Sequence, residues 1–185
     1  MKKNYSWAAL LLASPAAAHV GMSHVTGFMA GVAHPLSGLD HLCAMLAVGL
    51  WAQQQKGDAK YIIPVAFVST MVFGGALGMA HVPMPGVECG IAASVLVLGL
   101  LTASATRVST PAASVLVGLF ALFHGHAHGA EMPASSGGFE YAQGFIVSTI
   151  ALHGTGLLLG SIMEKRVTRY AGAAIAITGL ALLIK

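Results

Sequence analysis

The sequence predicts an all-α membrane protein, a bundle of six transmembrane helices that follows a cleavable signal peptide. Of the 185 residues, 56% are apolar and only 8% are charged, whereas an ordinary soluble domain carries about 25% charged residues. So few charges cannot cover the surface of a soluble globule, and disordered chains are rich in charge and poor in apolar residues. Long uncharged runs separate the charges, and a bilayer accommodates such runs as helices of about 20 residues.

The first 18 residues have the pattern of a secretory signal peptide. Two lysines near the start precede a short apolar run, and the segment ends with the small residues Ala16-Ala17-Ala18, a typical cleavage signal. We therefore expect cleavage after Ala18, which leaves residues 19–185 as a single six-helix transmembrane domain that begins outside the membrane. The alternative is an uncleaved first helix.

Uncharged runs define the spans, because ionised side chains are expensive inside a bilayer. The segment from Gly21 to His34 is too short and too rich in glycine for a separate crossing, and we predict an outer-side or partly re-entrant element there. The six spans that follow are predicted at about 36–54, 60–82, 87–106, 111–130, 139–163 and 167–184.

The basic residues orient the bundle, since short loops rich in Lys and Arg stay in the cytoplasm. The loops after the first, third and fifth spans carry Lys56, Lys60, Arg107, Lys165, Arg166 and Arg169, whereas the opposite loops carry Glu88, Glu131 and Glu140. The N-terminus of the mature chain is then periplasmic, which agrees with the signal peptide, and the protein is multi-pass in the bacterial cytoplasmic (inner) membrane. The basic residues form no stripe, so nucleic acid is not expected as a partner.

Nine histidines are the most informative feature of so apolar a chain, and none lies in a predicted inner loop. His34 precedes the pair Asp40-His41 in the first span. An intramembrane Asp beside a His is costly to bury and usually marks an ion pathway. His34 and His41 are seven residues apart and are predicted to share a helix face, with Met45 one turn beyond. A hydrogen-bonded network at a helix entrance, and core packing for Met45, are the structural alternatives.

A second cluster lies at the outer end of the fourth span. His124 and His128 are one helical turn apart, and Glu131 lies one turn beyond His128. Imidazole and carboxylate ligands together suit ions such as Ni(II) and Co(II). His126 points elsewhere on a regular helix and is predicted to be a supporting or entry residue. The candidate metal ligands are therefore His34, Asp40, His41, His124, His128 and Glu131.

Further candidates for a pathway or capture role are His19, His24, Met45, His126 and His153. After cleavage His19 carries a free α-amino group beside its imidazole, and both can bind a divalent metal when deprotonated. His153 lies at membrane depth, where a satisfied core histidine is the alternative to a pathway role. No catalytic residues and no cofactor are predicted, and the chain has no phosphate-binding loop.

His34, Asp40 and His41, together with Phe123-His124-Gly125 and Glu131, resemble the two signature motifs of the HupE/UreJ nickel/cobalt permeases. The resemblance covers essentially the whole mature chain. Larger nickel/cobalt transporters have one residue fewer between the first His and the Asp-His pair. The resemblance implies a secondary transporter, not an enzyme, that takes up Ni(II) or Co(II) for hydrogenase or urease, whose maturation proteins are then candidate partners. It also implies that His34, Asp40, His41, His124 and Glu131 are needed for transport.

Two other functional classes stay open at this stage. A membrane metal sensor or metallochaperone-like partner would bind the ion without carrying it. A His-rich membrane di-iron oxidase is disfavoured, because such enzymes place their histidines on the cytoplasmic side.

Overall fold

The computed structural model describes residues 27–132 and 137–185. The predicted signal peptide, its cleavage after Ala18, and the capture candidates His19 and His24 lie outside these residues. Within the described ranges all regular secondary structure is helical. The helices are α1 (Gly27–Ser37), α2 (Leu39–Gln53), α3 (Ala59–Met79), α4 (Val87–Ser104), α5 (Thr110–Ala130), α6 (Gly138–Ile162) and α7 (Lys165–Leu183).

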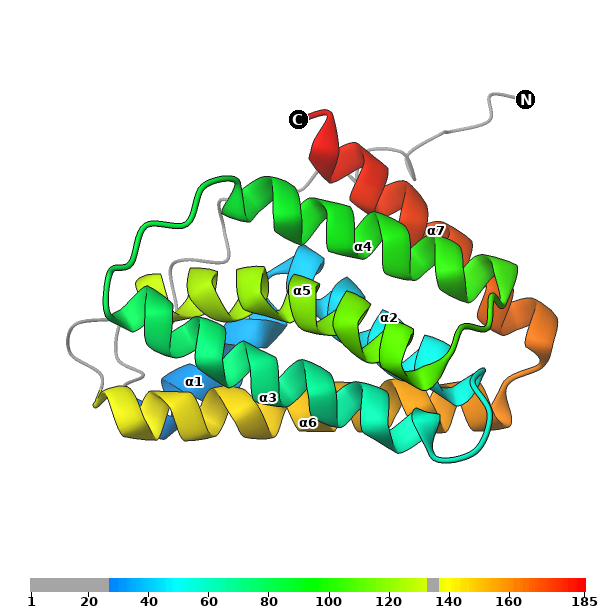
Figure 1. The fold of residues 1–185 in the computed structure, drawn as a ribbon, viewed down its shortest axis with the longest axis horizontal. Coiled ribbons are helices and arrows are strands. Elements are labelled where there is room, and N and C mark those ends of the chain that lie inside the picture. The colour runs from blue at the N-terminus through cyan, green and yellow to red at the C-terminus, as the bar shows by residue number, and fades with distance from the viewer. Residues whose placement is uncertain (1–26, 133–136) are drawn as a thin grey trace, which may run out of the picture.

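The long helices lie side by side along the longest axis of the molecule (Figure 1). The most extensive contacts pair α3 with α5, α4 with α7, and both α1 and α2 with α6. Four helices, α3 to α6, are long and apolar enough to cross a membrane, and α1 with α2 adds a fifth if the bent pair counts as one span. The all-helical multi-pass architecture is confirmed, whereas the predicted count of six spans is not.

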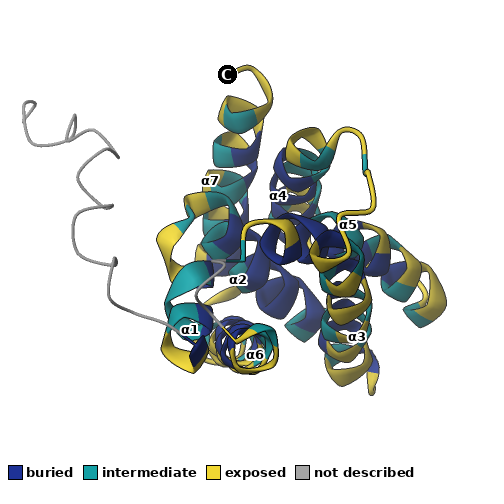
Figure 2. Ribbon diagram, turned by 90° about the vertical axis from the view of Figure 1, so that its left-hand side faces the viewer, coloured by how far each residue is buried: buried dark blue, intermediate teal, exposed yellow. Residues whose placement is uncertain are grey.

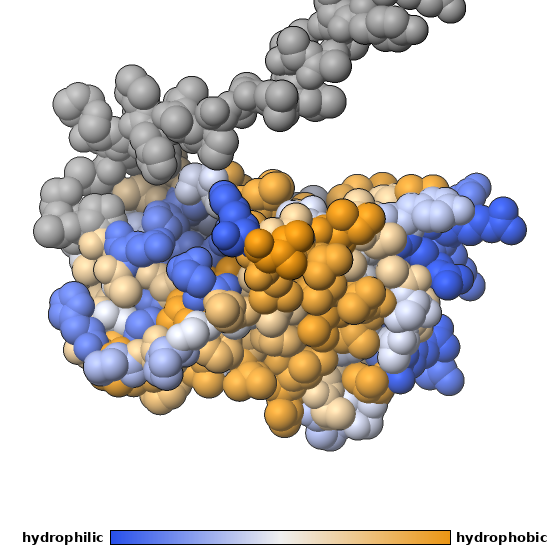
Figure 3. Space-filling view, turned by 90° about the horizontal axis from the view of Figure 1, so that it is seen from above, coloured by the Kyte–Doolittle hydropathy of each residue, from blue (hydrophilic) through white to orange (hydrophobic). Residues whose placement is uncertain are grey.

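The surface is arranged as a membrane protein requires. Figure 3 shows a broad hydrophobic band over the middle of the molecule, with hydrophilic residues gathered toward its two ends. Large apolar side chains such as Val65, Val115 and Ile177 point outward from the helices, which suits contact with lipid. Buried residues face the centre of the bundle instead (Figure 2). Met45 is among them, packed in the apolar core with Trp51 and Phe67, so the core-packing interpretation describes its position.

The first predicted span, 36–54, is divided by a sharp bend. Helices α1 and α2 meet at 84°, because Gly38 has an extended backbone with φ −101° and ψ 125°. The Ser37 hydroxyl donates to the His34 carbonyl oxygen at 2.6 Å, at the end of α1. His34 and His41 therefore belong to different helices, and the prediction that they share one helix face is wrong. The predicted short element before the first span corresponds to α1.

Helix α5 approaches α3 closely at its histidine-bearing end. A Cβ atom at Gly125 would collide with the carbonyl oxygen of Met71, and one at Gly129 would collide with that of Gly75. Backbone contact of this kind requires glycine at the crossing. It holds His124 and His128 at a defined rotation relative to α3.

We expect Gly125→Ala to destabilise the protein, because the new methyl group meets backbone atoms that cannot rotate away. Overpacking of this kind costs about 1–3 kcal/mol, which corresponds to a fall in melting temperature of about 2–12 °C for a domain of this size. Thermal unfolding in detergent measures the effect. Gly154→Ala is the matched control, since a Cβ there meets no atom within 4 Å, and an equal loss of stability in both variants would contradict the packing argument.

Candidate metal centre

Three ligating side chains converge at one end of the bundle. His34 lies in α1, His128 lies in the last turn of α5, and Glu131 directly follows the end of α5. One ligand atom from each side chain lies within 4.8 Å of the other two. His34 Nε2 donates to Glu131 Oε2 at 3.2 Å, and the His34 and His128 rings are 4.6 Å apart. We call His34, His128 and Glu131 the outer triad.

His128 is buried in the middle of this group. Its ring centroid is 3.7 Å from that of His41 and 4.2 Å from that of Phe145. Both ring nitrogens are buried without a hydrogen-bond partner in the described structure. Neutral imidazole with a free lone pair is a ligand for Ni, Co, Cu, Zn and Fe ions. The Glu131 side chain is 57% exposed, so an ion approaching from outside meets the carboxylate first.

A cavity of about 440 Å³ opens onto the outer triad. A water molecule occupies about 30 Å³ in the liquid, so the cavity has room for a cation with several of its waters. Glu88, predicted as an outer-loop charge that could attract cations, lines this cavity. The signal that could have found it is its place in the first turn of α4. The lining residues are His34, Ser37, Gly38, Asp40, His41, Glu88, Ile91, Ala127, His128 and Glu131.

A chain of hydrogen bonds runs inward beside the triad. The backbone N–H of His41 donates to Asp40 Oδ1 at 2.8 Å, and His41 Nδ1 lies 3.4 Å from the same oxygen. His41 Nε2 is 2.9 Å from His124 Nδ1. His124 Nε2 is 2.7 Å from the hydroxyl oxygen of Ser94. Ser94 was not among the residues predicted for the site, because one serine in an apolar helix carries no signal of its own.

The donor of each hydrogen bond in this series follows from counting protons. The single hydroxyl hydrogen of Ser94 is donated to the Ile91 carbonyl oxygen at 2.6 Å, so His124 Nε2 must be the donor to Ser94 Oγ. A neutral His124 then accepts at Nδ1 from His41 Nε2. Every nitrogen of His41 and His124 faces a partner, and a protonated His41 Nδ1 donates to Asp40.

The six predicted ligands therefore meet at one end of the bundle but fall into two groups. The outer triad has ligand atoms close enough to share one ion. Asp40, His41 and His124 instead hydrogen-bond to one another, and coordination through either imidazole requires one of these bonds to break. His41 reaches the triad through its ring, whose centroid is 3.7 Å from that of His128.

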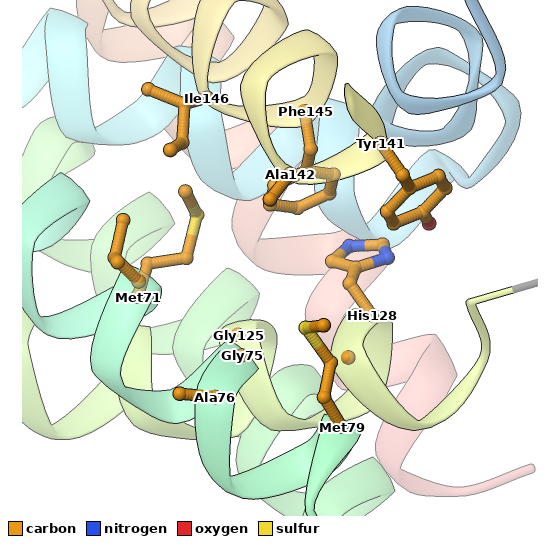
Figure 4. Close-up of a pocket in the computed structure, with 12 residues that line it drawn as sticks. Met71, Gly75, Ala76, Met79, Gly125, His128, Tyr141, Ala142, Phe145 and Ile146 are labelled. Carbon is orange, nitrogen blue, oxygen red and sulfur yellow. The ribbon is translucent and has the colours of Figure 1, made fainter. Parts of the chain in front are cut away.

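Behind His128 lies an apolar cavity of about 170 Å³ between α3, α5 and α6. Figure 4 shows the His128 ring between Tyr141 and Phe145 on one side and Met79 on the other. These side chains make the surroundings of this face of the imidazole apolar. The His128 ring also contacts the rings of His34 and Phe145, with centroids 4.6 and 4.2 Å away.

The remaining pathway candidates lie away from the triad. His126 Nε2 donates to the Val82 carbonyl oxygen at 2.7 Å, so its ring points away from the site as predicted. His153 lies deep in α6 with its ring 5.1 Å from that of Phe67. The structure does not bring His153 to the triad.

Glu131 is the acidic member of the triad and lies beyond the end of α5. The hydrogen bond from His34 holds the pKa of the Glu131 carboxyl below its usual value of 4.5, against the opposing effect of partial burial. The carboxylate is therefore ionised at neutral pH and available to a cation.

The lowered pKa of Glu131 predicts a pH-dependent contribution to stability. A carboxyl with a lowered pKa in the folded state stabilises the protein above about pH 4.5, and this contribution is lost as the pH falls through the folded-state pKa. We expect wild type to lose part of its stability advantage over Glu131→Gln as the pH falls from about 6 to 3. Thermal unfolding of the metal-free protein across this range measures it. A difference that does not change with pH would contradict the assignment.

The sequence matches the family described as HupE / UreJ protein over residues 7–182. It is also 48% identical over 181 residues to a protein of Rhizobium leguminosarum bv. viciae named Protein HupE, in an alignment that covers 96% of this chain and 94% of that relative. No solved structure matches the chain.

Proposed function

The chain belongs to the HupE/UreJ family, and from that premise we propose that it is a permease that takes up Ni(II) or Co(II) across the bacterial cytoplasmic membrane. The observation that carries the proposal is the outer triad, two imidazoles and a carboxylate beside a cavity at one end of a membrane-spanning bundle. The metal ion is the cargo, and the hydrogenase or urease it supplies is the inferred user.

The ligands of the triad suit a site that binds a metal ion and then releases it, rather than one that holds the ion permanently. Nitrogen and oxygen ligands fit Ni(II) and Co(II), which accept six-coordinate sites of mixed N and O donors. Three protein ligands leave the other positions to water, and a site that binds weakly enough to release its ion is what conduction requires. Asp40, His41 and His124 hydrogen-bond to one another beside the triad, and the His41 ring contacts the His128 ring.

The proposed topology has six crossings, with the mature N-terminus in the periplasm after cleavage following Ala18. Helix α7 supports a sixth crossing, because it packs along α4. Arg169 near its start lines a basic cavity with Arg107, whereas Lys185 after its end lines a cavity with Asp40 at the triad end. In this topology His19 and His24 lie outside and collect the cation before it reaches the triad.

The membrane potential supplies the driving force. A divalent cation moving inward gains about 4.6 kcal/mol per 100 mV, twice the value for one elementary charge. Uptake down this potential needs no ATP.

Influx into proteoliposomes tests the proposal. The purified full chain is reconstituted, and Ni(II) and Co(II) uptake is measured with an inside-negative potential and with Zn(II) as competitor. We expect saturable influx that rises with the potential and is absent from protein-free vesicles. Stoichiometric binding without influx would indicate a sensor or delivery protein instead. Iron retained through purification together with oxygen-dependent turnover would indicate an enzyme.

A further inference from the structure

His153 is a buried histidine that the outer triad does not use. It is 2% exposed, and neither ring nitrogen has a hydrogen-bond partner in the described structure. Thr149, one turn earlier on α6, donates its hydroxyl to the sulfur of Met71 at 3.7 Å rather than to His153. Leaving both polar atoms of a buried imidazole unpaired is unfavourable compared with an apolar side chain of similar size. Packing alone therefore does not account for histidine at this position.

The depth of His153 separates it from the triad. Tyr141 lies on the same helix with its ring 5.8 Å from the His34 ring, so it marks the level of the triad. His153 follows twelve residues later on continuous helix, which at the helical rise places it about 18 Å deeper in the bundle. It is closer to the end of α6 that carries the basic loop than to the end near the triad.

One aromatic ring lies between the outer histidines and His153. The Phe67 ring centroid is 5.8 Å from that of His124 and 5.1 Å from that of His153. Phe67 is fully buried in α3 and contacts both imidazoles. A buried apolar side chain between two polar positions is a typical hydrophobic constriction of a transport path.

On its other side His153 lines a groove between α3 and α6. This groove has a volume of about 320 Å³, and its rim is apolar and exposed at Val65 and Ile150, whereas Ser69 lines it beside His153. Tyr61, which also lines it, lies in the first turn of α3, at the end that the basic loops assign to the cytoplasm. The described residues that line the groove include no carboxylate, so a cation is not trapped there.

We propose that His153 is a second binding position for the transported divalent cation, an inner station reached after the cation leaves the outer triad and passes Phe67. The inference rests on the proposed transport function and adds an intramembrane site to it. One ring nitrogen coordinates the cation, and water fills the other positions. A single neutral ligand gives the weak binding that an intermediate position on a conduction path needs.

The test separates binding at the outer triad from influx. His153→Phe keeps a ring of similar size but removes the lone pairs. We expect this variant to bind Ni(II) at the triad as wild type does, by calorimetric titration in detergent, while Ni(II) influx into proteoliposomes falls about tenfold or more. Thr149→Val is the matched control, because it removes a buried polar group one turn away on α6, and its influx should equal that of wild type.

A second variant gives a readout that a purely structural role would not change. Thiolate favours Zn over harder ions relative to imidazole, so His153→Cys should raise the ratio of Zn(II) to Ni(II) influx while affinities at the triad stay unchanged. Wild-type influx in His153→Phe, or an unaltered ion ratio in His153→Cys, would overturn the inner station and leave the permease intact. Absence of influx in wild type would overturn the permease itself.

Discussion

Replacing His128 with alanine is expected to abolish Ni(II) binding at the outer triad and to reduce influx about a hundredfold or more, the upper range for disrupted metal sites. His128 is the buried member of the triad, and it contacts both His34 and His41. Its loss leaves one imidazole and one largely exposed carboxylate, which cannot compete with water for the cation. Calorimetric titration and proteoliposome influx measure the two effects.

His126→Ala is the matched control for this experiment. His126 lies on the same helix, is also buried, and donates to the Val82 carbonyl oxygen instead of facing the triad. Both variants remove a buried imidazole from the end of α5, so a difference between them reports on position. We expect His126→Ala to retain binding. Equal loss in both variants, or retained binding in His128→Ala, would contradict the assignment of the triad.

Asp40→Asn is expected to reduce influx about 10-fold to 100-fold, the range seen when a partner of a metal ligand is removed. The amide oxygen can still accept from the backbone N–H of His41, which Asp40 Oδ1 accepts at 2.8 Å. The negative charge that faces His41 Nδ1 at 3.4 Å is lost, however, and with it the charged acceptor beside this ring. His41 then loses its fixed orientation against His124 and His128.

Asp40→Glu and Glu140→Gln complete this experiment. Asp40→Glu keeps the charge on a longer side chain and should recover part of the influx. Glu140→Gln removes one charge at the same end of the bundle, and Glu140 does not line the cavity beside the triad, so its influx should match wild type. Full influx in Asp40→Asn would exclude a role for the carboxylate charge.

The uncharged runs predicted most of the helices because charge is excluded from the bilayer core along its whole thickness. The predicted spans 60–82 and 111–130 correspond to α3 (Ala59–Met79) and α5 (Thr110–Ala130), within a few residues at each end. A separate element before the first span was predicted, but the angle of 84° between the two was not, because an apolar run is the same whether its backbone is straight or bent. The side chains on either side of a break carry no periodicity that marks it.

For the site, spacing predicted which residues would meet but not what each would do. The pairing of His128 with Glu131 follows from helical periodicity, since residues three apart lie on one face. The separation of His41 and His124 from the triad depends on Ser94, which packs against His124 from a different helix. Contacts between helices of this kind are absent from any local pattern. The position of Glu88 beside the triad was not predicted either. Its helix, α4, carries no other charged side chain that could have marked a site.

Because of the bend at Gly38, the position of His34 in the triad depends on the angle between α1 and α2. His34 lies four residues from Gly38, about 6 Å along the helix axis at the helical rise. A rotation of α1 by about 10° about this hinge therefore displaces His34 by about 1 Å, whereas metal–ligand distances tolerate only about 0.2 Å. Coordination at the triad therefore depends on the packing of α1 against α6, which fixes the position of His34, and X-ray absorption at the metal edge would register a change in this position directly.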